Sequence, residues 1–162
     1  MVSPHDVTSD LLTPSDVRLL SDIGFVAACS SQRERAVQIF QALTLFRPLK
    51  AFPYLGLAVA NLNAKRPQEA IQSLALGRRV LGAATNPSRE IQEDYAMLGI
   101  FEGIAAQADE RRTEGLRLIK SALEQAPEDG PAARLGKRLL GVDQLEQLRP
   151  DDTLHSLQGG VR

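Results

Sequence analysis

The stretch AVQIFQALTLFRPLKAFPYLGLAVANLNAKRPQEAIQSL, residues 36 to 74, opens and closes on the same arrangement, an Ala followed four positions later by a large apolar residue. The first such pair is Ala36 and Phe40, and the second, 34 residues further on, is Ala70 and Leu74. Self-similarity at a fixed period of this length is the signature of a repeated supersecondary unit. The stretch therefore predicts that the chain is built from one recurring pair of helices.

The same pattern extends to both sides of this stretch. The first copy is formed by Leu20, Ile23, Gly24, Ala27, Ala36, Phe40 and Pro48. The second is formed by Tyr54, Leu57, Ala58, Asn61, Ala70, Leu74 and Gly82. A third copy begins 45 residues after the second, with Gly103, Gly115, Ile119, Ala122 and Pro127 on pattern and Glu102 where Leu is expected. The period and the order of small and apolar residues are typical of tetratricopeptide repeats. The small residues predict close helix crossings, beside which Phe40 or Leu74 fills the space.

Helix start and stop signals divide the chain further. Thr13, Pro14 and Asp16 predict a capped helix start, and Ser88 is a candidate N-cap of a later helix. We expect an all-α fold, a right-handed superhelix of three tetratricopeptide-like helix pairs plus a C-terminal capping helix. The expected segments are an N-terminal arm (1–12), repeats at about 17–50, 51–84 and 96–129, an insertion at about 85–95, a capping helix at about 131–148 and a tail (149–162). The alternative is a helix bundle in which small residues recur by chance.

Composition narrows the classes of function. The chain has 162 residues, a net charge of -1 and 43% apolar residues, with only 4% aromatic residues and no Trp. This balance gives no long-range field to gather nucleic acid, so we expect no nucleic-acid partner. The lone Cys29 excludes an intramolecular disulfide. No apolar stretch approaches the roughly 18 residues of a membrane span, and the N-terminus does not read as a secretory signal. We expect a cytoplasmic protein without membrane insertion.

Signs of catalysis are scarce. His5 and His155 fall in the predicted arm and tail, and Cys29 fits a small packing residue better than a nucleophile. The carboxylate pairs Glu128-Asp129 and Asp151-Asp152 sit in predicted loops and fit solvated turns. No nucleophile elbow, metal-spaced His pair or phosphate loop is present in the sequence. We therefore expect no enzyme activity, no metal and no cofactor.

A family resemblance lies in IFQALTLFRPLKAFPYLGLAVANL, residues 39 to 62. This segment resembles the middle of the tetratricopeptide chaperones of bacterial type III secretion, in which a Phe-Gln-Ala-Leu segment precedes a Leu-Gly-Leu-Ala-type helix. The resemblance is to the class II translocator chaperones or to related small export chaperones. It implies a cytoplasmic bacterial protein that holds a secreted partner in a concave groove, and a possible homodimer formed through the N-terminal helical region. The insertion and the weak acidity depart from the translocator chaperones.

The repeat register also predicts a partner-binding groove. The first helix of each pair lines the concave face of a stack of helix pairs. An apolar lining there suits an apolar segment of a protein partner, since a peptide carboxylate would need fixed cations. The residues predicted to line the groove are Phe25, Phe52, Leu55, Val59, Leu62, Met97, Ile100 and Ile104. The alternatives are that neighbouring helices or a dimer interface bury these side chains, and that the protein is a non-enzymatic adaptor subunit of a larger assembly.

Overall fold

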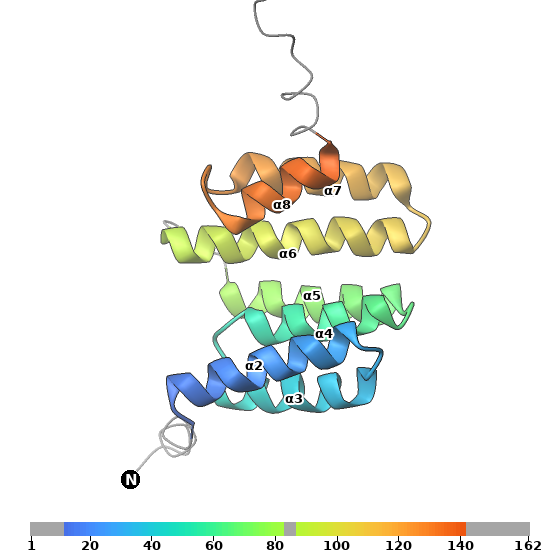
Figure 1. Ribbon diagram of the computed structural model, residues 1–162. Helices are drawn as coiled ribbons and strands as arrows, with labels where there is room; N and C mark the ends of the chain where they lie inside the picture. Colours follow the sequence, from blue (N-terminus) through green and yellow to red (C-terminus); the bar gives the residue numbers. More distant parts are fainter. Residues whose placement is uncertain (1–11, 83–86, 142–162) are drawn as a thin grey trace, which may run out of the picture.

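The computed structural model describes residues 12–82 and 87–141 (Figure 1). These residues form seven α-helices, α2 (Pro14–Cys29), α3 (Arg33–Phe46), α4 (Phe52–Asn63), α5 (Pro67–Leu81), α6 (Arg89–Ala108), α7 (Arg112–Gln125) and α8 (Pro131–Leu140). The described residues contain no strand, so the predicted all-α class is confirmed. The predicted N-terminal arm and C-terminal tail, with His5 and His155, lie outside the described residues except for Leu12.

The helices stack as consecutive antiparallel pairs, α2 with α3, α4 with α5 and α6 with α7 (Figure 1). Each first helix also contacts the first helix of the next pair, α2 with α4 and α4 with α6, and α8 continues this series by packing on α6 and α7. Within the described ranges, the second helices α3, α5 and α7 do not contact one another. The first helices therefore form the more closely spaced layer of the stack.

The turn inside each pair repeats the same backbone conformation. Ser31, Lys65 and Glu110 have φ values of 61°, 59° and 64°, a region that residues other than glycine seldom adopt. The next residue in each turn donates its amide to a carbonyl five residues back: Gln32 to Ala27 at 3.0 Å, Arg66 to Asn61 at 2.9 Å and Arg111 to Ala106 at 2.8 Å. These turns are spaced by the 34 and 45 residues that the sequence pattern predicted. The backbone therefore supports a repeated unit independently of the side chains.

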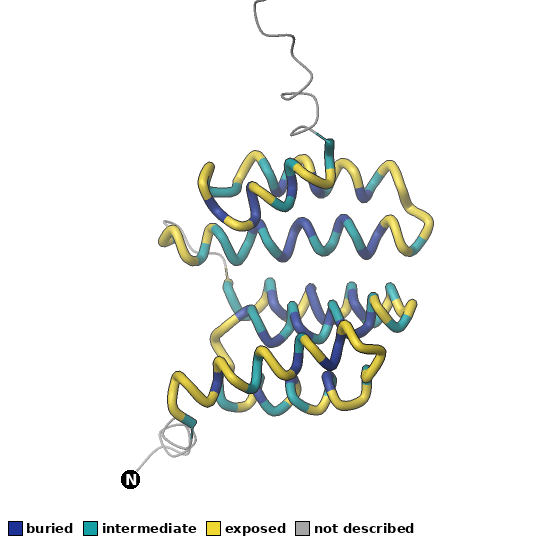
Figure 2. The backbone as a smooth tube through the Cα atoms, viewed as in Figure 1, coloured by how far each residue is buried: buried dark blue, intermediate teal, exposed yellow. Residues whose placement is uncertain are grey.

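Glycines allow a large side chain to lie between the first two pairs. Phe40 of α3 is fully buried, and a Cβ atom added to Gly24 would lie 2.9 Å from its ring. A Cβ atom added to Gly56 would lie only 2.2 Å from the same ring. The sequence predicted that Gly24 permits close packing beside Phe40. Gly56 on α4 permits the same close packing on the other side of the contact with this ring. Buried positions recur along the middle of the stack, at α4, α5 and α6 (Figure 2).

Two boundaries differ from the predicted ones. The capping helix ends at Leu140 rather than near residue 148, because Gly141 adopts the left-handed conformation (φ 71°, ψ 13°) that commonly terminates a helix. Residues 142–148 of the predicted helix lie outside the described residues. Residues 89–95 of the predicted insertion form the first turns of α6, so the insertion lengthens this helix as well as the preceding connection.

A carboxylate from α6 holds the start of α8. Gly130, the N-cap of α8, has no side chain that could accept a hydrogen bond from the first turn. Glu93 supplies one instead, because its Oε1 accepts a hydrogen bond from the amide of Ala132. An acidic group at a helix N-terminus also interacts favourably with the helix dipole. Glu93 therefore links the capping helix to the third pair.

The start of α2 shows the predicted capping box. The amide of Thr13 donates to Asp16 Oδ2 at 2.9 Å, its hydroxyl donates to the same oxygen at 2.7 Å, and the Asp16 amide donates to Thr13 Oγ1 at 3.2 Å. The predicted N-cap Ser88 is likewise confirmed, as its hydroxyl accepts from the Ile91 amide at 3.3 Å. Hydrogen bonds from the Thr13 side chain and backbone lower the pKa of the Asp16 carboxyl below its ordinary value.

This capping box predicts a pH effect on the first helix. Since the folded-state pKa of Asp16 is lowered, its contribution to stability is present above the unfolded-state pKa of about 3.9 and is lost as the pH falls through the folded-state value. Thermal unfolding of the protein between neutral and strongly acidic pH measures this loss. We expect Asp16→Asn to show a smaller decrease in melting temperature over this range than the unmodified chain, with Asp22→Asn on the same helix as the control. Equal decreases in the Asp16→Asn and unmodified proteins would contradict the role of the capping box.

Candidate functional site

The central first helix, α4, carries a stripe of apolar side chains. Phe52, Leu55, Val59 and Leu62 follow one another at helical spacing, and all four are half-buried. Leu55 and Leu62 pack against the core that α4 shares with α5 and α6, whereas Val59 packs against the core that α4 shares with α2 and α3. No residue of α4 is charged. The stripe is therefore apolar along its whole length and remains partly accessible.

On α6, the structure separates the predicted groove residues into two groups. Met97 and Ile104 are half-buried and pack against the core formed with α8. Ile100 is 0% exposed, because α8 packs over α6 and places Ala132 in the same cluster. Ile100 therefore belongs to the core and not to an accessible surface. Phe101, which the sequence analysis did not include, is half-buried and packs against the same cluster as Leu55 and Leu62.

Phe25 and Phe52 belong to the apolar core at the N-terminal end of the stack. The rings of Phe25 and Phe40 meet edge to face with their centroids 4.9 Å apart. Phe52 packs in the same cluster, which also contains Val17 and Leu43. The eight predicted residues are thus distributed over four apolar clusters. Those on the middle of the stack, together with Phe101, form what we call the α4–α6 surface: Leu55, Val59, Leu62, Met97, Phe101 and Ile104.

Glu102, the position at which the third copy departs from the repeat pattern, has a defined partner. Arg78 of α5 donates to Glu102 through two nitrogens, with Nη2 at 2.8 Å from Oε2, and lies over the Tyr95 ring. The hydrogen bonds that Arg78 donates to the Glu102 carboxylate raise the pKa of Arg78 above its ordinary value. A planar guanidinium matches a carboxylate in this two-bond geometry. Glu102 therefore joins the second pair to the third where the pattern would place an apolar contact.

The outer face of α2 is apolar and exposed. Leu19, Ile23 and Val26 lie on one face of the helix and are 59%, 44% and 66% exposed. Their repeat equivalents on α4 include Leu57 and Ala60, which pack against the first pair. None of the residues that the structure describes covers Leu19, Ile23 and Val26 as fully as the first pair covers Leu57 and Ala60. The helix face that α4 uses to pack on the preceding pair is therefore exposed on α2.

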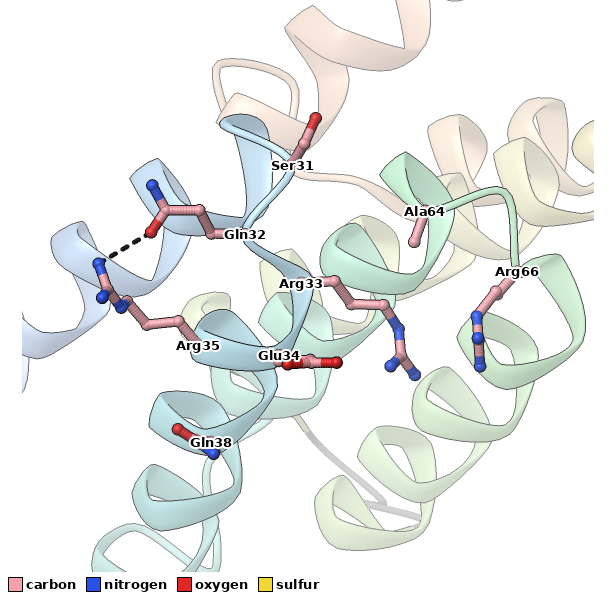
Figure 3. A pocket seen from close by; sticks show the side chains of 8 residues that line it. All are labelled: Ser31, Gln32, Arg33, Glu34, Arg35, Gln38, Ala64 and Arg66. Carbon is pink, nitrogen blue, oxygen red and sulfur yellow. Dashed lines mark hydrogen bonds between the residues drawn. The ribbon is translucent and has the colours of Figure 1, made fainter.

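A polar cleft lies at the turns of the first two pairs. It has a volume of about 780 Å³ and is lined mainly by residues from the α2–α3 turn, the start of α3 and the α4–α5 turn (Figure 3). Three arginines, Arg33, Arg35 and Arg66, line it together with a single acidic residue, Glu34. Small-molecule pockets are mostly apolar. This cleft instead has the character of a site for charged or polar groups.

Within residues 12–82 and 87–141, no group of three or more His, Cys, Asp or Glu residues could hold a metal ion. Cys29 is exposed at the end of α2, so the expectation that it serves as a packing residue is wrong. Among the described helices, none combines the length and apolar character needed to cross a bilayer.

The fold and these surfaces define the class of protein as an all-α chain of repeated helix pairs with partly open apolar faces. Comparisons with models of known protein families, with curated proteins and with solved structures gave no match.

Proposed function

We propose that this protein is a cytoplasmic chaperone of bacterial type III secretion that binds a segment of a secreted protein before export. The observation that carries the proposal is the uncharged α4 with its stripe of half-buried apolar side chains. The bound segment is apolar, and it contacts the α4–α6 surface. Its burial there removes apolar area from water on both partners, which favours binding and opposes aggregation of the secreted protein.

The packing of the layers supports this placement. The first helices contact one another along the stack, whereas the described second helices do not. In a curved stack of helices, the closely spaced layer lies on the inner side, which is the side that repeat proteins commonly use for binding. The α4–α6 surface lies in this layer. The resemblance of residues 39–62 to export chaperones supports the same function.

A second function, that of an adaptor subunit in a larger assembly, is favoured by the open face of α2. Leu19, Ile23 and Val26 provide apolar contacts to a second subunit, which is either another protein or another copy of this chain. The two functions differ in the lifetime of the complex. A chaperone releases its partner upon export, while an adaptor remains bound in the finished assembly.

The chaperone proposal predicts that charge on the α4–α6 surface prevents partner binding. Tagged full-length protein would be purified from its native cells, and the co-purifying proteins quantified by mass spectrometry. We expect one secreted, apolar-rich protein in near-equal amount. We expect Val59→Arg to lower its recovery by about tenfold or more, because the substitution places an unpaired charge in the apolar contact.

Two further variants make this result specific. Met97→Gln keeps a flexible side chain of similar length, and we expect it also to lower recovery without the risk that a charge disrupts folding. Leu45→Arg introduces the same charge on α3 at a position that is 73% exposed, and we expect it to leave recovery unchanged. Circular dichroism tests whether each variant remains helical. A helical Val59→Arg protein that retains its partner would contradict the proposal. If subunits of a finished assembly, rather than a secreted protein, co-purify with the tagged protein after export, the adaptor function would be favoured.

A further inference from the structure

The polar cleft contains an arginine whose position is fixed by a buried side chain. Asn61 is only 5% exposed, and its Oδ1 accepts a hydrogen bond from Arg33 Nε at 2.9 Å. The corresponding positions in the first and third turns are Ala27 and Ala106, so the polar residue is particular to the second pair. Within the described residues, no hydrogen bond or ion pair engages the terminal nitrogens of Arg33. Asn61 thus holds the guanidinium by one edge and leaves its other donors free.

A second arginine lines the same cleft. Arg66 comes from the α4–α5 turn, and its side chain and that of Arg33 converge in Figure 3. Its ion pair with Glu69 is long, at 3.4 Å, and both side chains are about half-exposed, so this pair holds Arg66 only weakly. Arg35, on the far side of the α3 start, is held by Gln32 through a hydrogen bond of 2.9 Å. The cleft therefore has a positive field from three arginines that is only partly compensated by Glu34 and Glu69.

At the third turn, the equivalent arginine is paired with acidic side chains. Arg111, the equivalent of Arg66, forms ion pairs with Asp109 at 3.0 Å and with Glu114 at 2.8 Å. Gln68 adds a hydrogen bond to the same Asp109 carboxylate at 2.8 Å. The charge at the third turn is thus satisfied within the protein, whereas that at the first two turns is available to a ligand.

We infer that this cleft binds an acidic segment of the polypeptide partner, with the Arg33 and Arg66 guanidinium groups donating to carboxylates of Asp or Glu side chains. Guanidinium groups bind carboxylates through paired, charge-assisted hydrogen bonds. A peptide fits better than nucleic acid, because the whole chain has a net charge of -1 and the cleft itself contains Glu34. The inference deepens the proposed function, since the site would bind a second, charged segment of the partner outside the α4–α6 surface.

A defined peptide tests the cleft without the native partner. The probe is a fluorescein-labelled peptide of alternating Asp and Glu, capped at both ends, and its binding to the full chain is measured by fluorescence anisotropy at low salt. We expect Arg33→Gln and Arg66→Gln each to weaken binding by about tenfold. Asn61→Ala keeps all three arginines but releases Arg33, and we expect it to weaken binding by about threefold. The matched control is Arg112→Gln, at the repeat position equivalent to Arg33 in the third turn, with an expected change below about twofold.

Each alternative gives a distinct result. Equal losses in Arg33→Gln and Arg112→Gln would overturn the inference, because binding would then reflect net charge alone. Competition by inorganic phosphate or oligodeoxythymidylate as effective as that by unlabelled peptide would assign the cleft to phosphate groups and also overturn it. A matched peptide of alternating Asn and Gln should not bind. Binding of the acidic peptide reports on the cleft, whereas recovery of the native partner by the α4–α6 surface variants reports on that surface, so the cleft and the chaperone proposal fail separately.

Discussion

Truncation of Phe40 to alanine is expected to lower the free energy of unfolding by about 3–5 kcal/mol. The side chain is fully buried and occupies the space that Gly24 and Gly56 leave on the two neighbouring helices. Because both neighbours are glycines, no side chain at either position can move into the cavity. The cavity term should therefore remain close to its maximum, and the loss should fall in the upper part of the range.

Urea unfolding followed by circular dichroism measures this effect, provided that the slope of the transition is unchanged. The control is Leu45→Ala on the same helix, because Leu45 is 73% exposed and its truncation should change stability by less than about 0.5 kcal/mol. A loss in Phe40→Ala similar to that in Leu45→Ala would mean that the first two pairs do not pack around this ring. The repeat interpretation of residues 36–74 would then lose its main physical support.

The fold was largely predictable because its signals are local. Thr13, Pro14 and Asp16 define a helix start within four residues, and the structure confirms the capping box. The repeat period was also readable, since Ala36 and Ala70 must be small wherever the two helices of a pair cross, and both are fully buried. The recurring turn conformation at Ser31, Lys65 and Glu110 had no clear sequence signal, because none of the three residues is glycine.

The candidate site was less predictable, because it depends on contacts between distant residues. Periodicity placed Ile100 on the same helix face as Met97 and Ile104, yet α8 covers Ile100 from more than 30 positions further along the chain. In the sequence, Asn61 stands only as the second-copy equivalent of Ala27. Its hydrogen bond to Arg33 spans 28 residues and could not be inferred from either residue alone. A polar residue where the other copies have a small or apolar one is nevertheless a useful signal, since Glu102 and Asn61 both accept hydrogen bonds from arginines.

At the crossing of α6 and α7, helix propensity and packing have opposite effects on the stability of a glycine-to-alanine variant. Gly115 and Gly103 face each other, and a Cβ atom on Gly115 would lie 2.5 Å from the Gly103 carbonyl oxygen. A Cβ atom on Gly103 would lie 2.7 Å from the Gly115 oxygen. Since the obstacle is backbone, no rotamer change relieves it, and the helices must move apart. We expect Gly115→Ala to lower the free energy of unfolding by about 1–3 kcal/mol, although alanine in a helix interior is favoured over glycine by about 1 kcal/mol.

Gly136→Ala in α8 separates the two contributions. A Cβ atom there would meet only side chains, at 3.3 Å from Leu123 Cδ1 and 3.5 Å from Ile100 Cδ1, and the Leu123 methyl group can move by the small distance required. Gly136→Ala should therefore leave the free energy of unfolding unchanged or raise it by at most about 1 kcal/mol. The midpoint of urea unfolding measures this change. Opposite signs for the two substitutions indicate that α6 and α7 touch through their backbones. A stabilised Gly115→Ala protein would mean that α6 and α7 cross at a greater distance than the structure shows.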